Sequence, residues 1–279
     1  MMRKIFQKSA KEFLKKEDQR SSILDPINAA KRFRLHRYLP SEDLAFFVEH
    51  HWVIHWDLRT QEPYRSEVLP FPSVNMVFSP ESATIAGVTT GKYSYEVRDQ
   101  GAIIGTMFRP GGFHPFIEQS ITVLTNKAIP ITTVFPGAGD HFRQTLLALK
   151  NDKSMVACVE KQLRTKKPNS NPYITLINQI INSVITNGTL CTVRAVAKHF
   201  DMSERTLQHI FQTYVGVGLK WIIMRYRLQD AAELALKVDS PNWAKIAAEL
   251  GYSSQSHFIN DFKKVIGKSP AQYAKSIRT

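Results

Sequence analysis

The sequence predicts an α+β protein in which a β-rich N-terminal domain precedes an all-α C-terminal domain. Three observations lead to this fold class. Between positions 38 and 125, short apolar runs alternate with Gly and Pro, which is typical of strands joined by tight turns. From 173 to 279, apolar residues recur at helical spacing. The stretch KKPNSNP between them, residues 166–172, has the composition of a linker.

The β-rich domain is predicted over residues 38–165, after a basic extension of residues 1–37. Its apolar runs, such as HWVIHWD and AIIGTMF, are short and closely spaced. Strands of this kind predict a sandwich or a barrel. We expect this domain to have a regulatory role, either by binding a small-molecule effector or by pairing two chains. The alternative is a domain that serves only oligomerisation or protein contacts.

A helix over residues 140–164 is predicted at the end of this domain, with Asp140 as its candidate cap. Phe142, Leu146 and Leu149 recur there at helical spacing. These side chains would pack either on the β-rich domain or on the same helix of a second copy. Residues 140–164 are therefore a candidate homodimer contact.

The C-terminal domain contains an internal repeat. Each copy consists of a short helix, a tight turn, a second helix and a Gly stop, which is the layout of a helix-turn-helix. Asp201 and Gly251 stand at the two turns, where a left-handed backbone is expected. Ser203 is the predicted N-cap of the second helix in the first copy. The repeated residues are Val196, Ala197, Leu207, Phe211 and Gly216 in the first copy and Ile246, Ala247, Phe258, Phe262 and Gly267 in the second.

The charge of the chain is concentrated at its two ends. Lys and Arg number 37 against 24 Asp and Glu, a net charge of +13. Residues 1–40 carry eleven basic and four acidic side chains, residues 41–170 thirteen of each, and residues 171–279 thirteen and seven. Excess positive charge favours a polyanionic partner. Combined with the helix-turn-helix repeat, this predicts double-stranded DNA as the partner.

Residues 173–279 resemble the DNA-binding domain of the AraC/XylS family of bacterial transcription regulators. The resemblance is carried by AVAKHFDMSERTLQHIFQTYVG, by KWIIMRYRLQDAAELAL and by IAAELGYSSQSHFINDFKKVIGKSPAQY. It implies two helix-turn-helix units joined by a long helix, in a sequence-specific transcription regulator rather than an enzyme, with no cofactor. Helices near 203–214 and 254–266 would read two successive major grooves. The chain departs from the family at Asp201, usually Gly, and at Leu219, usually Pro.

The candidate DNA-contacting side chains follow from the helical spacing of the two reading helices and from the family's base-reading positions. Arg can bond guanine through two donors, and Gln and Asn can bond adenine in the same two-pronged way. Basic residues outside the base-reading positions are expected to contact phosphates, which position the protein without specifying sequence. Lys268 and Arg225 are also assigned to phosphates, whereas Glu204 and Asp261 are expected to face solvent. The candidates are Arg205, Gln208, His209, Gln212, Gln255, Ser256, His257, Asn260, Lys263, Lys264 and Arg194.

Two features of the N-terminal half allow other interpretations. His51, His55 and Asp57 would lie on one face of a strand, and a metal-binding enzyme domain could use such a set. The segment FRPGGFHPF could present Arg109 to an anion, or it could simply be a turn held by Pro110 and the glycines that follow. We favour the turn, and we predict no metal.

Membrane association is not expected. No run approaches 18 apolar residues, and the basic residues 3–20 carry only a thin apolar stripe. The N-terminus lacks the apolar core of a signal peptide. With only Cys158 and Cys191, the chain has no disulfide framework, which fits the reducing cytoplasm.

Overall fold

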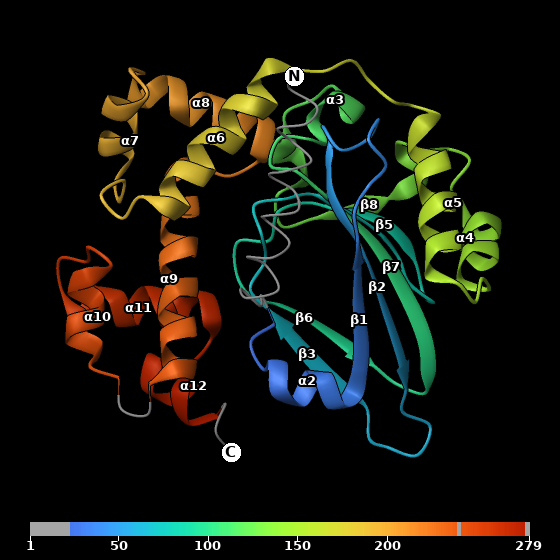
Figure 1. The fold of residues 1–279 in the computed structure, drawn as a ribbon, viewed down its shortest axis with the longest axis horizontal. Helices are drawn as coiled ribbons and strands as arrows, with labels where there is room; N and C mark the ends of the chain where they lie inside the picture. The colour runs from blue at the N-terminus through green and yellow to red at the C-terminus, as the bar shows by residue number, and fades with distance from the viewer. Residues whose placement is uncertain (1–22, 239–240, 277–279) are drawn as a thin grey trace.

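The computed structural model describes residues 23–238 and 241–276, and it confirms the predicted α+β class. Two antiparallel sheets lie between a pair of helices on one side and the helical C-terminal domain on the other (Figure 1). The basic residues 3–20, with their thin apolar stripe, lie outside the described residues. The N-terminal elements are α2 (Pro26–Arg32), β1 (Phe33–Tyr38), β2 (Val48–Asp57), β3 (Tyr64–Val68), β4 (Asn75–Phe78), β5 (Ala83–Ala86), β6 (Tyr93–Val97), β7 (Gln100–Phe108), α3 (His114–Ile117), η1 (Ile121–Leu124), β8 (Ala128–Pro130) and η2 (Ile131–Thr133).

The larger sheet has six strands in the order β1-β2-β7-β4-β5-β8, and the smaller pairs β3 with β6. Every pairing is antiparallel. The sheet begins at Phe33, ahead of the expected domain start at 38, because β1 pairs with β2 along its whole length. Along β2 the side chains alternate between the two faces of the large sheet, so His50 and Trp52 face one way and His51 and Val53 the other.

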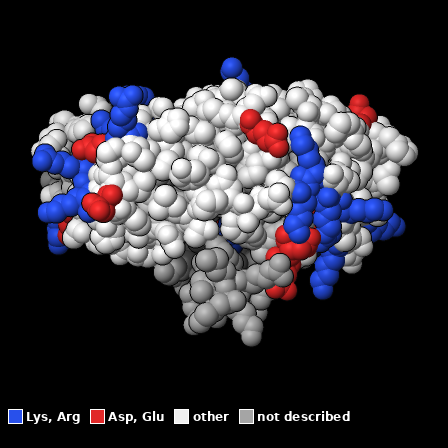
Figure 2. All heavy atoms as spheres, turned by 90° about the horizontal axis from the view of Figure 1, so that it is seen from above, with Lys and Arg blue, Asp and Glu red and all other residues white. Residues whose placement is uncertain are grey.

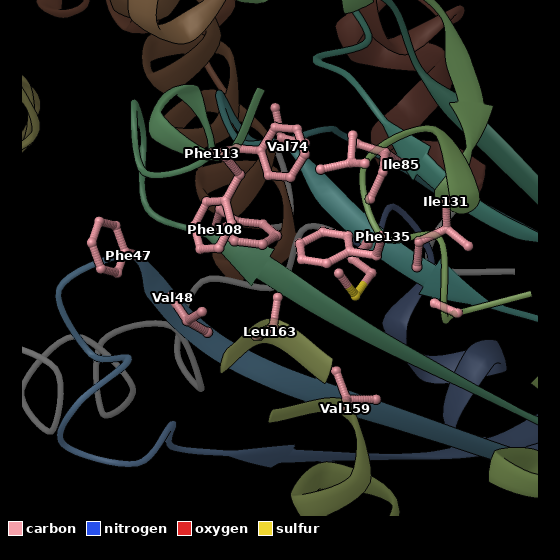
Figure 3. Close-up of a cluster of buried hydrophobic side chains, with 14 of the residues drawn as sticks. Phe47, Val48, Val74, Ile85, Phe108, Phe113, Ile131, Phe135, Val159 and Leu163 are labelled. Atoms are coloured by element: carbon pink, nitrogen blue, oxygen red, sulfur yellow. The ribbon is translucent and has the colours of Figure 1, made fainter. Parts of the chain in front are cut away.

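One face of the large sheet is covered by α4 (Asp140–Leu147) and α5 (Asp152–Arg164). Val159 and Leu163 of α5 point towards the aromatic side chains of this core, including Phe108 and Phe135 (Figure 3). The single helix predicted over 140–164 is therefore two helices. The second helix has its own N-cap, because the Asn151 side chain accepts a hydrogen bond from the Ser154 amide.

The apolar side chains of α4 pack on their own β-rich domain. Leu146 is fully buried in the core, and Phe142 and Leu149 are partly buried against it. Of the two alternatives for these positions, the structure therefore shows the intramolecular one. Asp140 is the first helical residue and Gly139 occupies the cap, without a side-chain bond. A homodimer through residues 140–164 stays a prediction, and it would have to use other side chains of this segment.

The C-terminal domain consists of seven helices in the described residues. The repeat appears as two helix-turn-helix units, α7–α8 and α10–α11, joined by the long helix α9 (Figure 1). Asp201 and Gly251 at the two turns have φ values of 51° and 72°. Ser203 caps α8 as predicted, by accepting from the Thr206 amide at 3.0 Å. The helices are α6 (Pro172–Thr186), α7 (Val193–His199), α8 (Glu204–Val215), α9 (Leu219–Lys237), α10 (Trp243–Glu249), α11 (Gln255–Ile266) and α12 (Pro270–Ser276).

Candidate nucleic-acid interface

The second helix of each unit has one buried and one exposed face. In α8, Leu207 and Phe211 are fully buried against the other helices of the domain. In α11, Phe258 and Phe262 occupy the equivalent positions in a second cluster. The aromatic and aliphatic side chains of one face therefore fix the rotation of each helix about its axis. The opposite face of each helix is left to polar residues.

All eleven predicted contact residues are exposed. In α8, Arg205, Gln208 and His209 follow one another on the outer face near the helix start, and Gln212 lies one turn further on. In α11 the exposed side chains are Gln255, Ser256, His257, Asn260, Lys263 and Lys264. Arg194 is exposed on α7. The structure thus groups the candidates on the outer faces of the two helix-turn-helix units.

Four basic members of this set could pair with an anionic partner, because their charges are not engaged in ion pairs within the described residues. In the part of the chain that the structure describes, no ion pair is formed by Arg194, Arg205, Lys263 or Lys264. Glu204 is exposed, as expected, and Asp261 is half-buried, with one carboxylate oxygen 3.6 Å from His257 Nε2. Seen from above, Lys and Arg gather at both ends of the molecule, at the first unit and at the opposite end beside α4 and α5, with some acidic side chains among them, and the middle of this face carries few charges (Figure 2).

Comparison with known proteins places this site in a family. A model described as "Helix-turn-helix domain" matches residues 196–276, which include both units. The chain is 36% identical over 85 residues to an uncharacterized HTH-type transcriptional regulator of Haemophilus influenzae, covering 30% of this chain and 28% of that protein. Residues 196–276 are an AraC-type helix-turn-helix domain.

Two further likenesses accompany this match. The chain is 26% identical over 130 residues to the transcriptional regulatory protein HptR of Staphylococcus aureus, covering 46% of this chain and 50% of HptR. The chain thus spans half or less of these two curated relatives. The structure of the C-terminal domain of AraT, a response regulator from Geobacillus stearothermophilus, matches with 26% sequence identity and a TM-score of 0.34. The match covers 38% of this chain and 86% of the AraT chain. Residues 36–130 match a domain of unknown function (DUF6597).

The AraC-type domain is docked on the β-rich domain through the end of α8. Tyr214 lies in the last turn of α8. It is half-buried, and its ring lies 4.1 Å from that of His114 and 4.9 Å from that of Tyr173. One residue beyond the helix, the Gly216 carbonyl accepts a hydrogen bond from Thr125 Oγ1 at 2.6 Å. Burial beside Tyr214 lowers the pKa of His114, which favours the neutral imidazole.

The assignment of Arg225 to phosphate was wrong. This side chain of α9 has no solvent exposure, and its Nε donates to the Pro70 carbonyl at 3.0 Å. Its guanidinium lies 4.3 Å from the Phe71 ring centre. Arg225 therefore binds the AraC-type domain to the β-rich domain. The sequence did hold a signal for this, because Ile222 and Leu228, three positions before and after Arg225 on the same face of α9, are apolar and buried.

Lys268, the other extra phosphate candidate, is half-buried beside α12, and its Nζ donates to Ser276 Oγ at 3.1 Å. Its assignment to phosphate stays a prediction.

Arg109 is not an anion site either. It is buried, its Nη1 lies 2.6 Å from Glu49 Oε2, and its Nε donates to the Ala45 carbonyl at 2.8 Å. The segment is the turn that we favoured, with Gly111 at a φ of 81°. Arg109 thus satisfies buried acceptors of its own domain.

The three residues of the metal hypothesis do not converge. His51 Nδ1 lies 2.8 Å from Thr106 Oγ1, whereas His55 Nε2 lies 2.7 Å from Asp152. Asp57 forms an ion pair with its neighbour Arg59. Within residues 23–238 and 241–276, no group of three or more His, Cys, Asp or Glu side chains could hold a metal ion. None of the described helices is long and apolar enough to span a membrane.

Proposed function

We propose that this protein is a sequence-specific, DNA-binding transcription regulator in which α8 and α11 enter two successive major grooves. The observation that carries the proposal is the repetition of one surface. Two helices with the same buried pattern each present an exposed polar face, and that polar face contains basic residues. The long helix α9 joins the two units, so a single chain can read both grooves, which lie roughly 34 Å apart. The proposed partner implies work in the cytoplasm.

The exposed residues divide by their chemistry into two roles. Arg205, Gln208 and Asn260 have the donor and acceptor geometry to read base edges. His209, Gln212, Gln255, Ser256 and His257 would complete the contacts along the two grooves. Lys263, Lys264 and Arg194 would bond phosphates and fix the position of the duplex.

Control through the β-rich domain is part of the proposal. This domain touches the end of α8 through Thr125 and the middle of α9 through Pro70. A change in either contact would alter how the two reading helices are held relative to each other. This contact favours a regulatory role over a domain that only pairs chains.

The test uses the full chain. A pool of random duplexes is incubated with the protein, and the bound duplexes are sequenced. We expect enrichment of a site with two short conserved blocks about one helical turn apart. Affinity for that site should fall steeply as salt is raised, because bound counterions are released from the DNA. Enrichment of a single block, or of none, would contradict the assignment of both helices.

A further inference from the structure

The two helix-turn-helix units have separate hydrophobic cores, and α9 runs through both (Figure 1). On α9, Ile223 and Tyr226 belong to the core of the first unit, whereas Leu228 and Ala231 belong to the core of the second. Arg227 lies between these two stretches and is half-buried. The helix therefore passes from one core to the other at Arg227.

The guanidinium of Arg227 bonds the first unit just before α7. Its Nη2 donates to the Cys191 carbonyl at 2.6 Å. The preceding residue, Leu190, is buried in the core of the first unit. The following residue, Thr192, caps α7 by accepting from the Ala195 amide at 3.1 Å. The backbone at Cys191 is therefore held on both sides, and the bond ties the start of α7 to α9.

The same guanidinium contacts the second unit just before α11. It lies 5.4 Å from the centre of the Tyr252 ring, over its face. The Tyr252 ring in turn packs edge-on against His257 at 5.3 Å and Phe258 at 5.4 Å. Phe258 is fully buried in the second core, and His257 is one of the proposed DNA contacts. Tyr252 therefore links Arg227 to both faces of α11.

The two units approach each other closely at this point. A Cβ on Gly251, in the second turn, would lie 3.0 Å from Arg227 Nη2 and 3.4 Å from Cys191 Sγ. Arg227 thus fills the space between the segment before α7 and the turn before α11. The units are joined once along α9 and again by this bridge beside it. Because a long helix can bend, the additional bridge resists rotation of one unit against the other.

We propose that Arg227 is a positioning residue, which fixes the relative orientation of α8 and α11 and thereby sets the spacing of the two DNA blocks that the protein accepts. The effect on DNA rests on the proposed DNA-binding function, whereas the bridge between the units does not. One base pair inserted between the blocks moves the second block by about 3.4 Å and turns it by roughly a tenth of a helical turn. A rigid pair of reading helices cannot follow this displacement, whereas a pair that rotates freely can.

The preference for one spacing separates this role from a merely structural one. Affinity of the full chain is measured for the enriched duplex and for duplexes with one base pair added or removed between the blocks. Arg227→Lys keeps the charge but lacks the planar guanidinium. We expect its affinity for the enriched spacing to fall about tenfold, and its affinity for the altered spacings to stay as in wild type. The control Arg194→Lys, at an exposed site on α7, should leave the ratio of these affinities unchanged.

The bridge itself is tested without DNA, by the distance between one spin label on α8 and one on α11. Cys158→Ser and Cys191→Ser remove the native thiols and keep the backbone carbonyl that Arg227 bonds. Labels are then attached through Gln212→Cys and Lys264→Cys, both at exposed sites. Double electron–electron resonance should give a narrow distance distribution in this background and a broader one when Arg227→Lys is added.

Circular dichroism checks that each variant is folded. If Arg227→Lys is not, Tyr252→Leu replaces it in both measurements, because it removes the ring that Arg227 contacts. A distance distribution that stays narrow in the folded variant, or an unchanged ratio of affinities, overturns the inference. A wild-type chain that binds no duplex, but whose distribution broadens with Arg227→Lys, refutes the proposed function and leaves the bridge in place. Duplex binding with one spacing preference in both wild type and variant refutes this inference alone.

Discussion

At the scale of single residues, the proposed function gives exposed basic side chains one of two roles, reading a base or contacting a phosphate. Arg205 lies near the start of α8 on its exposed face, whereas Lys264 lies in the last turn of α11. A bidentate contact to one base carries sequence information, and a contact to a phosphate carries none. Two exposed basic residues should therefore give different phenotypes when truncated.

Arg205→Ala should cost about 1–3 kcal/mol on the enriched duplex and relax preference at one base position. Lys264→Ala should weaken all duplexes about equally and reduce the slope of affinity against salt. Both are measured by fluorescence anisotropy on the enriched duplex and on single-base variants of it. Unchanged base preference in Arg205→Ala would show that α8 does not enter the groove with this face.

His50 gives the β-rich domain a pH-dependent stability. Burial first, and then the charges of Arg37, His51 and Arg109, lower its pKa to about 3, from 6.5 for the free side chain. Between these two values the unfolded chain takes up a proton that the folded chain does not. Stability is therefore present above pH 6.5 and is lost as the pH falls towards 3.

The measurement is the free energy of unfolding by urea at several pH values. In His50→Gln, we expect the free energy of unfolding to fall less steeply between pH 6.5 and 4 than in the wild type, because the variant lacks this titrating group. His209→Gln, at an exposed position on α8, is the control and should keep the wild-type slope. Identical slopes for wild type and His50→Gln would mean that His50 takes up its proton at the same pH in the folded and the unfolded chain.

At the scale of elements, the end of α8 shows how one residue joins the two domains. Gly216 ends the helix with a φ of 92°, and its carbonyl accepts from Thr125. A Cβ at this position would lie 2.9 Å from atoms of Ile121 and Thr125. The helix stop and the domain contact therefore both require glycine here.

Gly216→Ala should lower the free energy of unfolding by more than about 1 kcal/mol, from backbone strain and from the close contacts. Gly188→Ala is the matched control, since a Cβ there has no atom within 4 Å. It should change stability by no more than about 0.5 kcal/mol. Thermal and urea denaturation measure both variants. If the two substitutions changed the free energy of unfolding equally, η1 would have to move away from α8 without loss of stability.

At the scale of the whole molecule, a buried guanidinium holds the two domains together. Arg225 of α9 donates to Pro70 and also contacts Leu69 and Gln229. Arg225→Met keeps an apolar side chain of similar length but removes these donors. We expect a loss of about 1–3 kcal/mol for each buried carbonyl left without its donor.

Arg194→Met is the control, because Arg194 is exposed and should affect stability by less than about 0.5 kcal/mol. Limited proteolysis between the domains adds a second measurement, and only Arg225→Met should accelerate cleavage near residues 166–171. If Arg225→Met had the same free energy of unfolding as the wild type, this would contradict the role of Arg225 in holding the two domains together.

The amino-acid sequence by itself determined the local features of the protein. Helical spacing, the Ser203 cap and the left-handed turns at Asp201 and Gly251 depend on residues a few positions apart, and all appear in the structure. The exposure of the reading faces follows from the same spacing, because a helix that buries Leu207 and Phe211 must turn Gln208 and Gln212 outward.

Only the tertiary structure decided what happens between distant segments. Charge alone made Arg225 and Arg109 look like sites for anions, but each is buried against carbonyls or a carboxylate far away in sequence. The bridge at Arg227 likewise joins the segment before α7 to the turn before α11, and no single run of residues contains both. Spacing along the chain reports the face of a helix or strand, whereas the partner that covers this face is chosen by packing of the whole chain.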